Sequence, residues 1–234
     1  YATYVIAAQP QLYDLSAMSD DDYFLNEKNP EILFTYGYYL VSYYAWLAKC
    51  NFPISDDLQA LYGDNDWRLT HFFYKRGAVY TAQKSETSGT TGIYGYAFRT
   101  AEAYLNRAEA YAEKGDKDKA LQDLKTIREK RLKVYEEVQA VTKEDVIRRV
   151  REERRRELSF EFHRWFDLRR WDRPRIEHTF TPDIKQPDVV EKYVLEKDDP
   201  AYTLPLPRSV VEYDPTLVDN PRPQRENQNV TGEN

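Results

Sequence analysis

The sequence predicts a mainly α-helical protein in which helices pack as hairpins, with irregular loop-rich and minor β segments beside them. Apolar residues recur at helical spacing over residues 99–132, and Gly115 divides this pattern into two halves. A second amphipathic pattern begins after Thr142 and continues toward Pro174. With 234 residues and 41% hydrophobic content, the chain is large enough for one or two packed cores.

Residues 1–98 are rich in aromatic side chains and in loop-forming residues. Strand and helix spacing each fit parts of residues 30–49, so the type of this segment stays open. We expect a short helix over residues 56–62 and a pair of strands over residues 67–80. Residues 83–95 contain many Ser, Thr and Gly residues, which is typical of a loop.

The two halves of residues 99–132 resemble one tetratricopeptide unit. The matching positions are Tyr104, Arg107, Ala108, Tyr111, Ala120 and Leu124. The small residues Ala108 and Ala120 would let two helices approach closely. The pattern departs at Arg107, where leucine is usual, and no proline closes the unit. Because one such repeat cannot bury its own faces, we expect it to pack against further helices.

We expect further helices over residues 142–160 and 161–172, with Pro174 ending the helical region by Arg173 at the latest. Thr142 is a good N-cap residue, and acids follow it in the first turn. The expected apolar face consists of Val146, Ile147, Val150, Leu158, Phe162, Trp165 and Phe166. Arg154 interrupts this face, so its stem should lie along the interface or its head should meet an acid.

The arginine-rich stretch argues against nucleic-acid binding. Between Glu144 and Arg175 there are eleven arginines and eight acids, interleaved at pairing distance. A DNA-binding face usually keeps its cations free for phosphates, and this chain carries a net charge of −6. Glu157, Glu161 and Asp167 lie among arginines, which favours low pKa values and ion pairing over acid catalysis.

The same stretch carries a resemblance to a known family. Residues 157–171, Glu-Leu-Ser-Phe-Glu-Phe-His-Arg-Trp-Phe-Asp-Leu-Arg-Arg-Trp, are similar to the C-terminal signature of the SusD-like (RagB/SusD) outer-membrane lipoproteins of Bacteroidetes. Further segments match the family in the same order: Pro53–Tyr62 with Asp64–Arg68, Arg99–Ala110, Tyr202–Pro207 and Asn220-Pro221. The resemblance extends from about residue 30 to residue 222. It implies the C-terminal half of a SusD-like protein, with the N-terminal half absent.

The resemblance also implies how one SusD-like domain is organised. Residues 1–98 would be a loop-rich, aromatic, ligand-facing region with short helices and possible strands. Residues 99–175 would be the helical tetratricopeptide-like scaffold, and residues 176–234 an extended, proline-containing C-terminal cover segment.

SusD-like proteins bind glycans at the cell surface and deliver them to a TonB-dependent transporter, so the resemblance implies a glycan ligand and a SusC-like barrel as partner. The resemblance also implies that the protein lies on the extracellular face of the outer membrane, where it would be attached only through a lipid anchor in the absent N-terminal part. Aromatic rings stack on sugar rings, and polar groups bind the hydroxyl rim. The expected ligand-binding residues are Trp46, Trp67, Tyr74, Asn65, Arg68 and Tyr44.

Two other functional classes stay open: a tetratricopeptide-type module that binds proteins or peptides and, with less support, a glycan-degrading enzyme. His71, His163 and His178 show no metal-binding spacing, and no phosphate loop or nucleophile elbow is present. We therefore predict no catalytic residue, metal or cofactor. The sequence shows neither a signal peptide nor an apolar run long enough to span a membrane.

Overall fold

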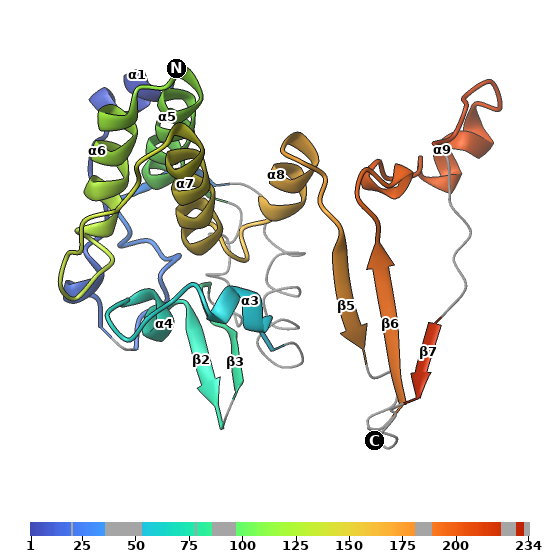
Figure 1. The fold of residues 1–234 in the computed structure, drawn as a ribbon, viewed down its shortest axis with the longest axis horizontal. Helices are drawn as coiled ribbons and strands as arrows, with labels where there is room; N and C mark the ends of the chain where they lie inside the picture. The colour runs from blue at the N-terminus through green and yellow to red at the C-terminus, as the bar shows by residue number, and fades with distance from the viewer. Residues whose placement is uncertain are drawn as a thin grey trace. The chain divides into compact units, whose positions relative to one another are not determined.

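A computed structural model describes residues 1–19, 21–35, 53–77, 79–85, 97–180, 189–220 and 228–231. The chain forms two compact units, Tyr1–His163 and Arg164–Asn234, whose elements are drawn in Figure 1. The boundary falls within the arginine-rich stretch. The three regions expected from the sequence divide the chain elsewhere, and their roles stay a prediction.

The first unit is mainly helical, which confirms the predicted fold class. The helices in its described residues are α1 (Ala2–Ala8), α3 (Asp56–Gln59), α4 (Arg68–His71), α5 (Thr100–Lys114), α6 (Lys117–Arg128) and α7 (Lys143–Glu157), and the 3-10 turn described there is η1 (Leu15–Ala17). Helices α5, α6 and α7 lie side by side, and α1 packs against α5 (Figure 1).

Helices α5 and α6 form the hairpin that the tetratricopeptide pattern predicted. Gly115 ends α5 in the left-handed conformation, at φ 80°, where glycine is favoured because it has no Cβ. The amide of Gly115 donates to the carbonyl of Ala112 at 3.0 Å. Arg107, which replaces the usual leucine, pairs across the hairpin with Asp123 on α6 at 2.6 Å. An ion pair thus links the two helices at the position where the tetratricopeptide pattern usually has leucine.

Helix α7 begins as predicted, with Thr142 as its N-cap. The Thr142 hydroxyl accepts from the Asp145 amide, and the Asp145 carboxylate accepts from the Thr142 amide, which is a capping box. The helix ends at Glu157, and Phe160 and Phe162 then adopt positive φ values of 60° and 66°. These conformations interrupt the helical face that the sequence predicted.

Much of the predicted face of residues 142–172 is nevertheless buried. Val146, Val150 and Leu158 lie in the core, whereas Phe162 and Phe166 are 47% and 63% exposed. The prediction was wrong for these two rings because the backbone turns after Glu157 and ends the 3.6-residue period.

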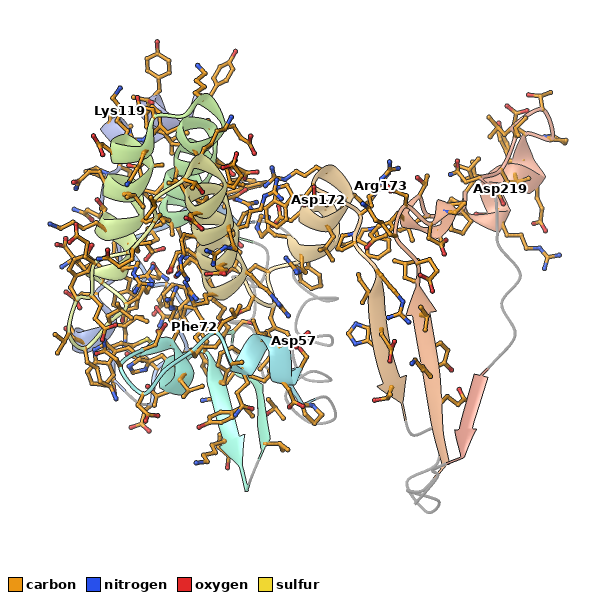
Figure 2. The ribbon with its side chains drawn as sticks, viewed as in Figure 1. Asp57, Phe72, Lys119, Asp172, Arg173 and Asp219 are labelled. Carbon is orange, nitrogen blue, oxygen red and sulfur yellow. The ribbon has the colours of Figure 1, made fainter. Side chains whose placement is uncertain are left out.

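Two apolar clusters support the first unit. One lies among α1, α5, α6 and α7, with Leu105, Leu124 and Val150 fully buried. The other joins α3, α4 and the segment before β1 (Ile32–Thr35) through buried aromatic side chains. The ring centroids of Phe24 and Phe72 lie 4.7 Å apart in this second cluster, and Phe72 is labelled in Figure 2.

The described residues of the first unit also contain two small antiparallel sheets. Strand β1 pairs with β4 (Ala97–Arg99), and β2 (Phe73–Arg76) pairs with β3 (Val79–Ala82). The strand pair predicted over residues 67–80 therefore starts later than expected, because α4 occupies its first part. The short helix predicted over residues 56–62 is confirmed as α3, which Ser55 caps through a hydrogen bond to the Leu58 amide.

In its described residues, the second unit contains α8 (Arg164–Arg170), α9 (Arg208–Tyr213), the 3-10 turn η3 (Pro200–Tyr202) and an antiparallel sheet. The sheet has the order β5-β6-β7, with β5 at Ile176–Phe180, β6 at Val189–Leu195 and β7 at Gln228–Thr231. We expected an extended cover segment here, and the sheet was not predicted. Tyr202, in the motif noted from the sequence, is 1% exposed and stacks on Trp165.

None of the helices in the described ranges is both long and apolar enough to cross a membrane.

Candidate functional site

A buried network of charged side chains connects the elements of the first unit. Its centre is Glu157 on α7, which is 0% exposed. The network, referred to below as the ion network, consists of Glu31, Asp66, Arg68, Lys84, Arg99, Arg131, Glu153, Glu157 and Glu161. Some of these residues lie on β4, α4 and α7, and the others lie in the segments next to β1, α4, β3, α6 and α7. The network therefore fixes the positions of these elements relative to one another.

Glu157 is surrounded by three guanidinium groups. Its Oε1 accepts from Arg99 Nη1 and from Arg131 Nη2, each at 3.0 Å. Its Oε2 accepts from Arg131 Nε at 2.9 Å and from Arg68 Nη1 at 3.2 Å. Four hydrogen bonds therefore use the acceptor capacity of this buried carboxylate.

Two further glutamates pair with arginines of the same group. Glu31 accepts from Arg99 Nη1 at 2.6 Å and from Arg131 Nη2 at 2.5 Å. Glu161 accepts from Arg99 Nε at 2.8 Å and Nη2 at 2.7 Å, and it also accepts from Lys84. Such planar, bidentate pairing is characteristic of arginine.

The network keeps Glu157 and Glu161 ionised. Burial by itself would raise the pKa of Glu157, but the guanidinium groups of Arg131 and Arg99 hold that pKa well below its usual range. Burial acts the same way on Glu161, and Arg99 with Lys84 lowers its pKa. The predicted low pKa values of Glu157 and Glu161 are confirmed. Neither group can serve as a protonated general acid near neutral pH.

Lys84 is the one lysine in the network. Its ammonium group donates to the carbonyl of Glu157 at 2.5 Å and lies 4.0 Å from the centre of the Phe72 ring. Burial lowers the pKa of Lys84 to about 8, although the charge of Glu161 acts in the opposite direction. Lys84 is therefore the network cation that titrates closest to neutral pH.

Arg68, one of the expected ligand contacts, belongs to this network instead. Its side chain is 0% exposed and donates to Asp66, Glu153 and Glu157. A ligand outside the protein cannot reach it, so the assignment of Arg68 as a polar ligand contact is corrected to a structural role.

Asn65 also has a structural function. Its side-chain amide donates to the carbonyl of Val134 at 2.7 Å and to Glu136 at 3.1 Å, and its Oδ1 accepts from the Val134 amide at 2.9 Å. These bonds fix the segment after α6 against the turn before α4. Both ends of the amide are thus used within the protein.

Trp67 is partly buried beside the second apolar cluster. The ammonium group of Lys133 lies 5.1 Å from the centroid of the Trp67 ring. The ring centroids of Trp67 and His71 lie 5.9 Å apart. Its indole Nε1 is enclosed and has no acceptor in the described parts of the chain. Lys133 therefore occupies a face that a sugar would need for stacking.

Tyr74 is the most exposed of the expected contacts that the structure describes. It lies on β2 opposite Thr81, and 46% of it is exposed to solvent. Trp46 and Tyr44 fall outside the described residues. The structure therefore places Trp67, Asn65 and Arg68 on one turn and Tyr74 on the following strand.

Sequence reasoning missed an exposed aromatic pair, Phe34 and Phe98. Phe34 on β1 and Phe98 on β4 face each other across the sheet, with ring centroids 6.3 Å apart. They are 59% and 48% exposed. Because β1 was left open between strand and helix, its cross-strand neighbour could not be predicted.

A metal centre is not visible in the described ranges, where no group of three His, Cys, Asp or Glu side chains is arranged to hold an ion. The described part of the candidate site therefore consists of aromatic rings beside a fully paired charged framework.

Comparisons with solved structures show a shared fold. A SusD superfamily protein from Bacteroides thetaiotaomicron matches 94% of this chain and 55% of its own, with 24% identity and a TM-score of 0.70. A SusD superfamily protein from Bacteroides vulgatus matches 96% of this chain and 54% of its own, with 23% identity and a TM-score of 0.59.

A third structure is a SusD-like carbohydrate binding protein from Bacteroides vulgatus. It matches 84% of this chain and 46% of its own, with 20% identity and a TM-score of 0.57. The chain thus spans about half the length of these three proteins.

No curated protein matches the chain. The SusD family model, in contrast, matches residues 32–222, which is most of the sequence and includes both the ion network from Asp66 onward and the signature stretch. This chain belongs to the SusD family.

Proposed function

We propose that this protein is a cell-surface glycan-binding accessory protein that delivers nutrients to a TonB-dependent outer-membrane transporter. The observation that carries the proposal is the family match over residues 32–222. One structural relative is named a carbohydrate binding protein, which supports a glycan as the ligand class. The transporter partner, the outer-membrane location and a lipid anchor in a longer protein are parts of the same proposal.

The chemistry of the candidate site is compatible with binding. An aromatic ring can stack on the apolar C–H face of a sugar, and loops or short strands held by a rigid scaffold can carry such rings. Tyr74 offers an exposed ring on β2. Trp67, Tyr44 and Trp46 stay in the proposal as further ring contacts, with Lys133 having to move away from Trp67.

The charged framework favours binding over catalysis. Glycoside hydrolysis needs one carboxyl group that keeps its proton near neutral pH. Glu153, Glu157 and Glu161 are buried, paired with arginines and held at low pKa by those arginines, which outweigh the raising effect of burial. We therefore propose that the protein is not an enzyme.

The test compares two tyrosine variants of the complete gene product. We expect Tyr74→Ala to weaken binding to a soluble polysaccharide by about 1–3 kcal/mol, the range for an aromatic binding contact. Tyr4→Ala is the control, because Tyr4 is 78% exposed on α1, at the other end of the first unit (Figure 1). Calorimetry against a panel of polysaccharides and oligosaccharides gives both affinities. Equal dissociation constants for Tyr74→Ala and the unaltered protein would remove Tyr74 from the site.

A tetratricopeptide-type module that binds proteins or peptides is the second candidate, favoured by the α5–α6 hairpin. It predicts that a transporter barrel stays bound after the exposed aromatic residues are replaced by alanine. It also predicts heat with peptides and none with any glycan in the same calorimetric panel.

A further inference from the structure

A cavity of about 210 Å³ is lined by residues of α6, of α7 and of the segment that joins them. Three arginines line it: Arg128 from α6, and Arg149 and Arg156 from α7. Leu124 and Val138 add apolar surface to the wall. This volume exceeds the roughly 30 Å³ that one water occupies in the liquid several times over, so the cavity can hold a small molecule.

The guanidinium groups at this cavity share few carboxylates. Glu153 Oε2 accepts from Arg128 Nη1 at 3.1 Å and from Arg156 Nη2 at 3.0 Å. The other oxygen of Glu153 already binds Arg68 in the ion network, at 2.6 Å. One carboxylate therefore serves three guanidinium groups, two of which face the cavity.

Arg149 is paired outside the cavity wall. Its Nη1 donates to Glu152 at 3.1 Å, and Glu152 also accepts from Arg148 at 3.4 Å. The wall includes two more glutamates, Glu136 and Glu137. Both are exposed, and neither lies within 4.0 Å of a cationic group in the part of the chain that the structure describes. Glu136 instead accepts from the Asn65 amide.

Two donors in this wall are enclosed without a partner. The Nε–H groups of Arg128 and Arg149 have no acceptor within hydrogen-bond distance among the described residues. A buried donor without an acceptor is unfavourable, so an arrangement that supplies an acceptor is preferred. These two Nε–H groups are therefore the donors of the wall residues that an oxyanion would supply with an acceptor.

We propose that this cavity binds an oxyanion, carried as the carboxylate of a single sugar acid or present as a free anion. Guanidinium groups bind carboxylate and sulfate through paired, charge-assisted hydrogen bonds. Arg128 and Arg149 supply the unused donors, and Arg156 adds positive charge beside them. The site is independent of the glycan-stacking proposal, because it stands even if Tyr74 contacts no ligand.

The experiment follows the arginine Nε–H signals of the 234-residue chain by ¹⁵N NMR. The probes are sodium glucuronate, sodium sulfate and glucose, with sodium chloride keeping the ionic strength constant, so that general screening is excluded. We expect glucuronate to shift the Arg128 and Arg149 signals in a saturable way and glucose to leave them unchanged. Sulfate that binds as tightly as glucuronate identifies a free-oxyanion site, and weaker sulfate binding identifies a sugar-acid site.

Two variants on α7 complete the test. Arg149→Gln should weaken glucuronate binding about tenfold or more, as expected for loss of a charge-assisted contact. Arg148→Gln, which removes an exposed arginine paired with Asp145 at 2.8 Å, should leave it unchanged. The proposal is overturned if neither glucuronate nor sulfate gives a saturable shift, or if both variants bind like the unaltered chain. A negative result for the oxyanion site does not change the result expected for Tyr74→Ala, so the two proposals are tested independently.

Discussion

At the residue scale, Glu157 connects more of the fold than any single ring does. Its carboxylate meets Arg68, Arg99 and Arg131, which come from three different parts of the chain. A buried ion pair adds little stability compared with an apolar pair of the same shape. Removing one partner, however, leaves the remaining charges unpaired in a low-dielectric interior, which is strongly destabilising. The network therefore favours one arrangement of these elements over alternatives.

Glu157→Gln should lower the free energy of unfolding by about 3–5 kcal/mol at neutral pH, because it leaves buried guanidinium groups without their shared charge. Glu144→Gln, on the exposed first turn of the same helix, should cost less than about 1 kcal/mol. Urea denaturation of both variants measures the difference. Similar losses of unfolding free energy in the two variants would show that Glu157 contributes no more to stability than an exposed glutamate of the same helix.

The same pair of proteins also gives a pH test. The folded-state pKa of Glu157 lies below its usual value of 4.5, so its stabilising contribution is present above that value and is lost as the pH falls toward the folded-state pKa. The stability gap between the unaltered chain and Glu157→Gln should therefore narrow below pH 4.5. A constant gap would mean that Glu157 titrates normally in the folded protein.

Lys84 predicts a second rise of stability with pH, in the alkaline range. Its pKa is about 8 when folded, against a usual 10.5, so between these values the unfolded chain holds a proton that the folded chain has released. The free energy of unfolding should then rise with pH, by an amount on the order of 1–3 kcal/mol. Lys84→Met should lack this rise, because methionine does not titrate. Parallel stability curves over pH 8–10 would show that Lys84 keeps its proton.

At the element scale, the α5–α6 hairpin depends on one left-handed residue. A Cβ at Gly115 would meet no atom within 4 Å, so only its backbone conformation, at φ 80°, resists substitution. Gly115→Ala should cost about 1 kcal/mol through that strain. Gly63→Ala is the matched control, since Gly63 has open space around it and no left-handed φ. Thermal unfolding should separate the two variants, and equal melting temperatures would contradict this account.

The elements that could be predicted from the sequence are those fixed by local patterns. Thr142 and Gly115 mark helix ends through caps that short peptides already favour, so α5, α6 and the start of α7 followed from the sequence. The break after Glu157 did not, because the left-handed φ values of Phe160 and Phe162 have no glycine to signal them. The sheet of the second unit was also missed, since its strands mix charged and apolar residues and lie among prolines.

The candidate site was hard to predict from the sequence because its charged residues pair with partners far away along the chain. The sequence indicated that Glu157 and Glu161 pair with arginines, but it pointed only to the arginines of the same stretch. The structure instead brings Arg99 and Arg131 from other elements. Arg68 looked like a ligand contact because it follows a tryptophan in a turn, and only tertiary packing shows it to be buried.

At the scale of the whole molecule, the residues that hold the fold together are different from the rings proposed to bind ligand. The ion network and the α5–α7 bundle hold the first unit, while Tyr74 and other rings lie on short strands and turns at its surface. In a longer SusD-family protein, the same framework would present these rings to a glycan and leave its bonds intact. Binding without transformation is therefore the central claim.

One measurement tests that claim most directly: calorimetric titration of the complete gene product with soluble polysaccharides, followed by an assay for reducing ends in the same samples. We predict saturable heat with at least one polysaccharide and no increase in reducing ends after prolonged incubation. Release of reducing ends, or heat with none of the polysaccharides and oligosaccharides, would contradict the account.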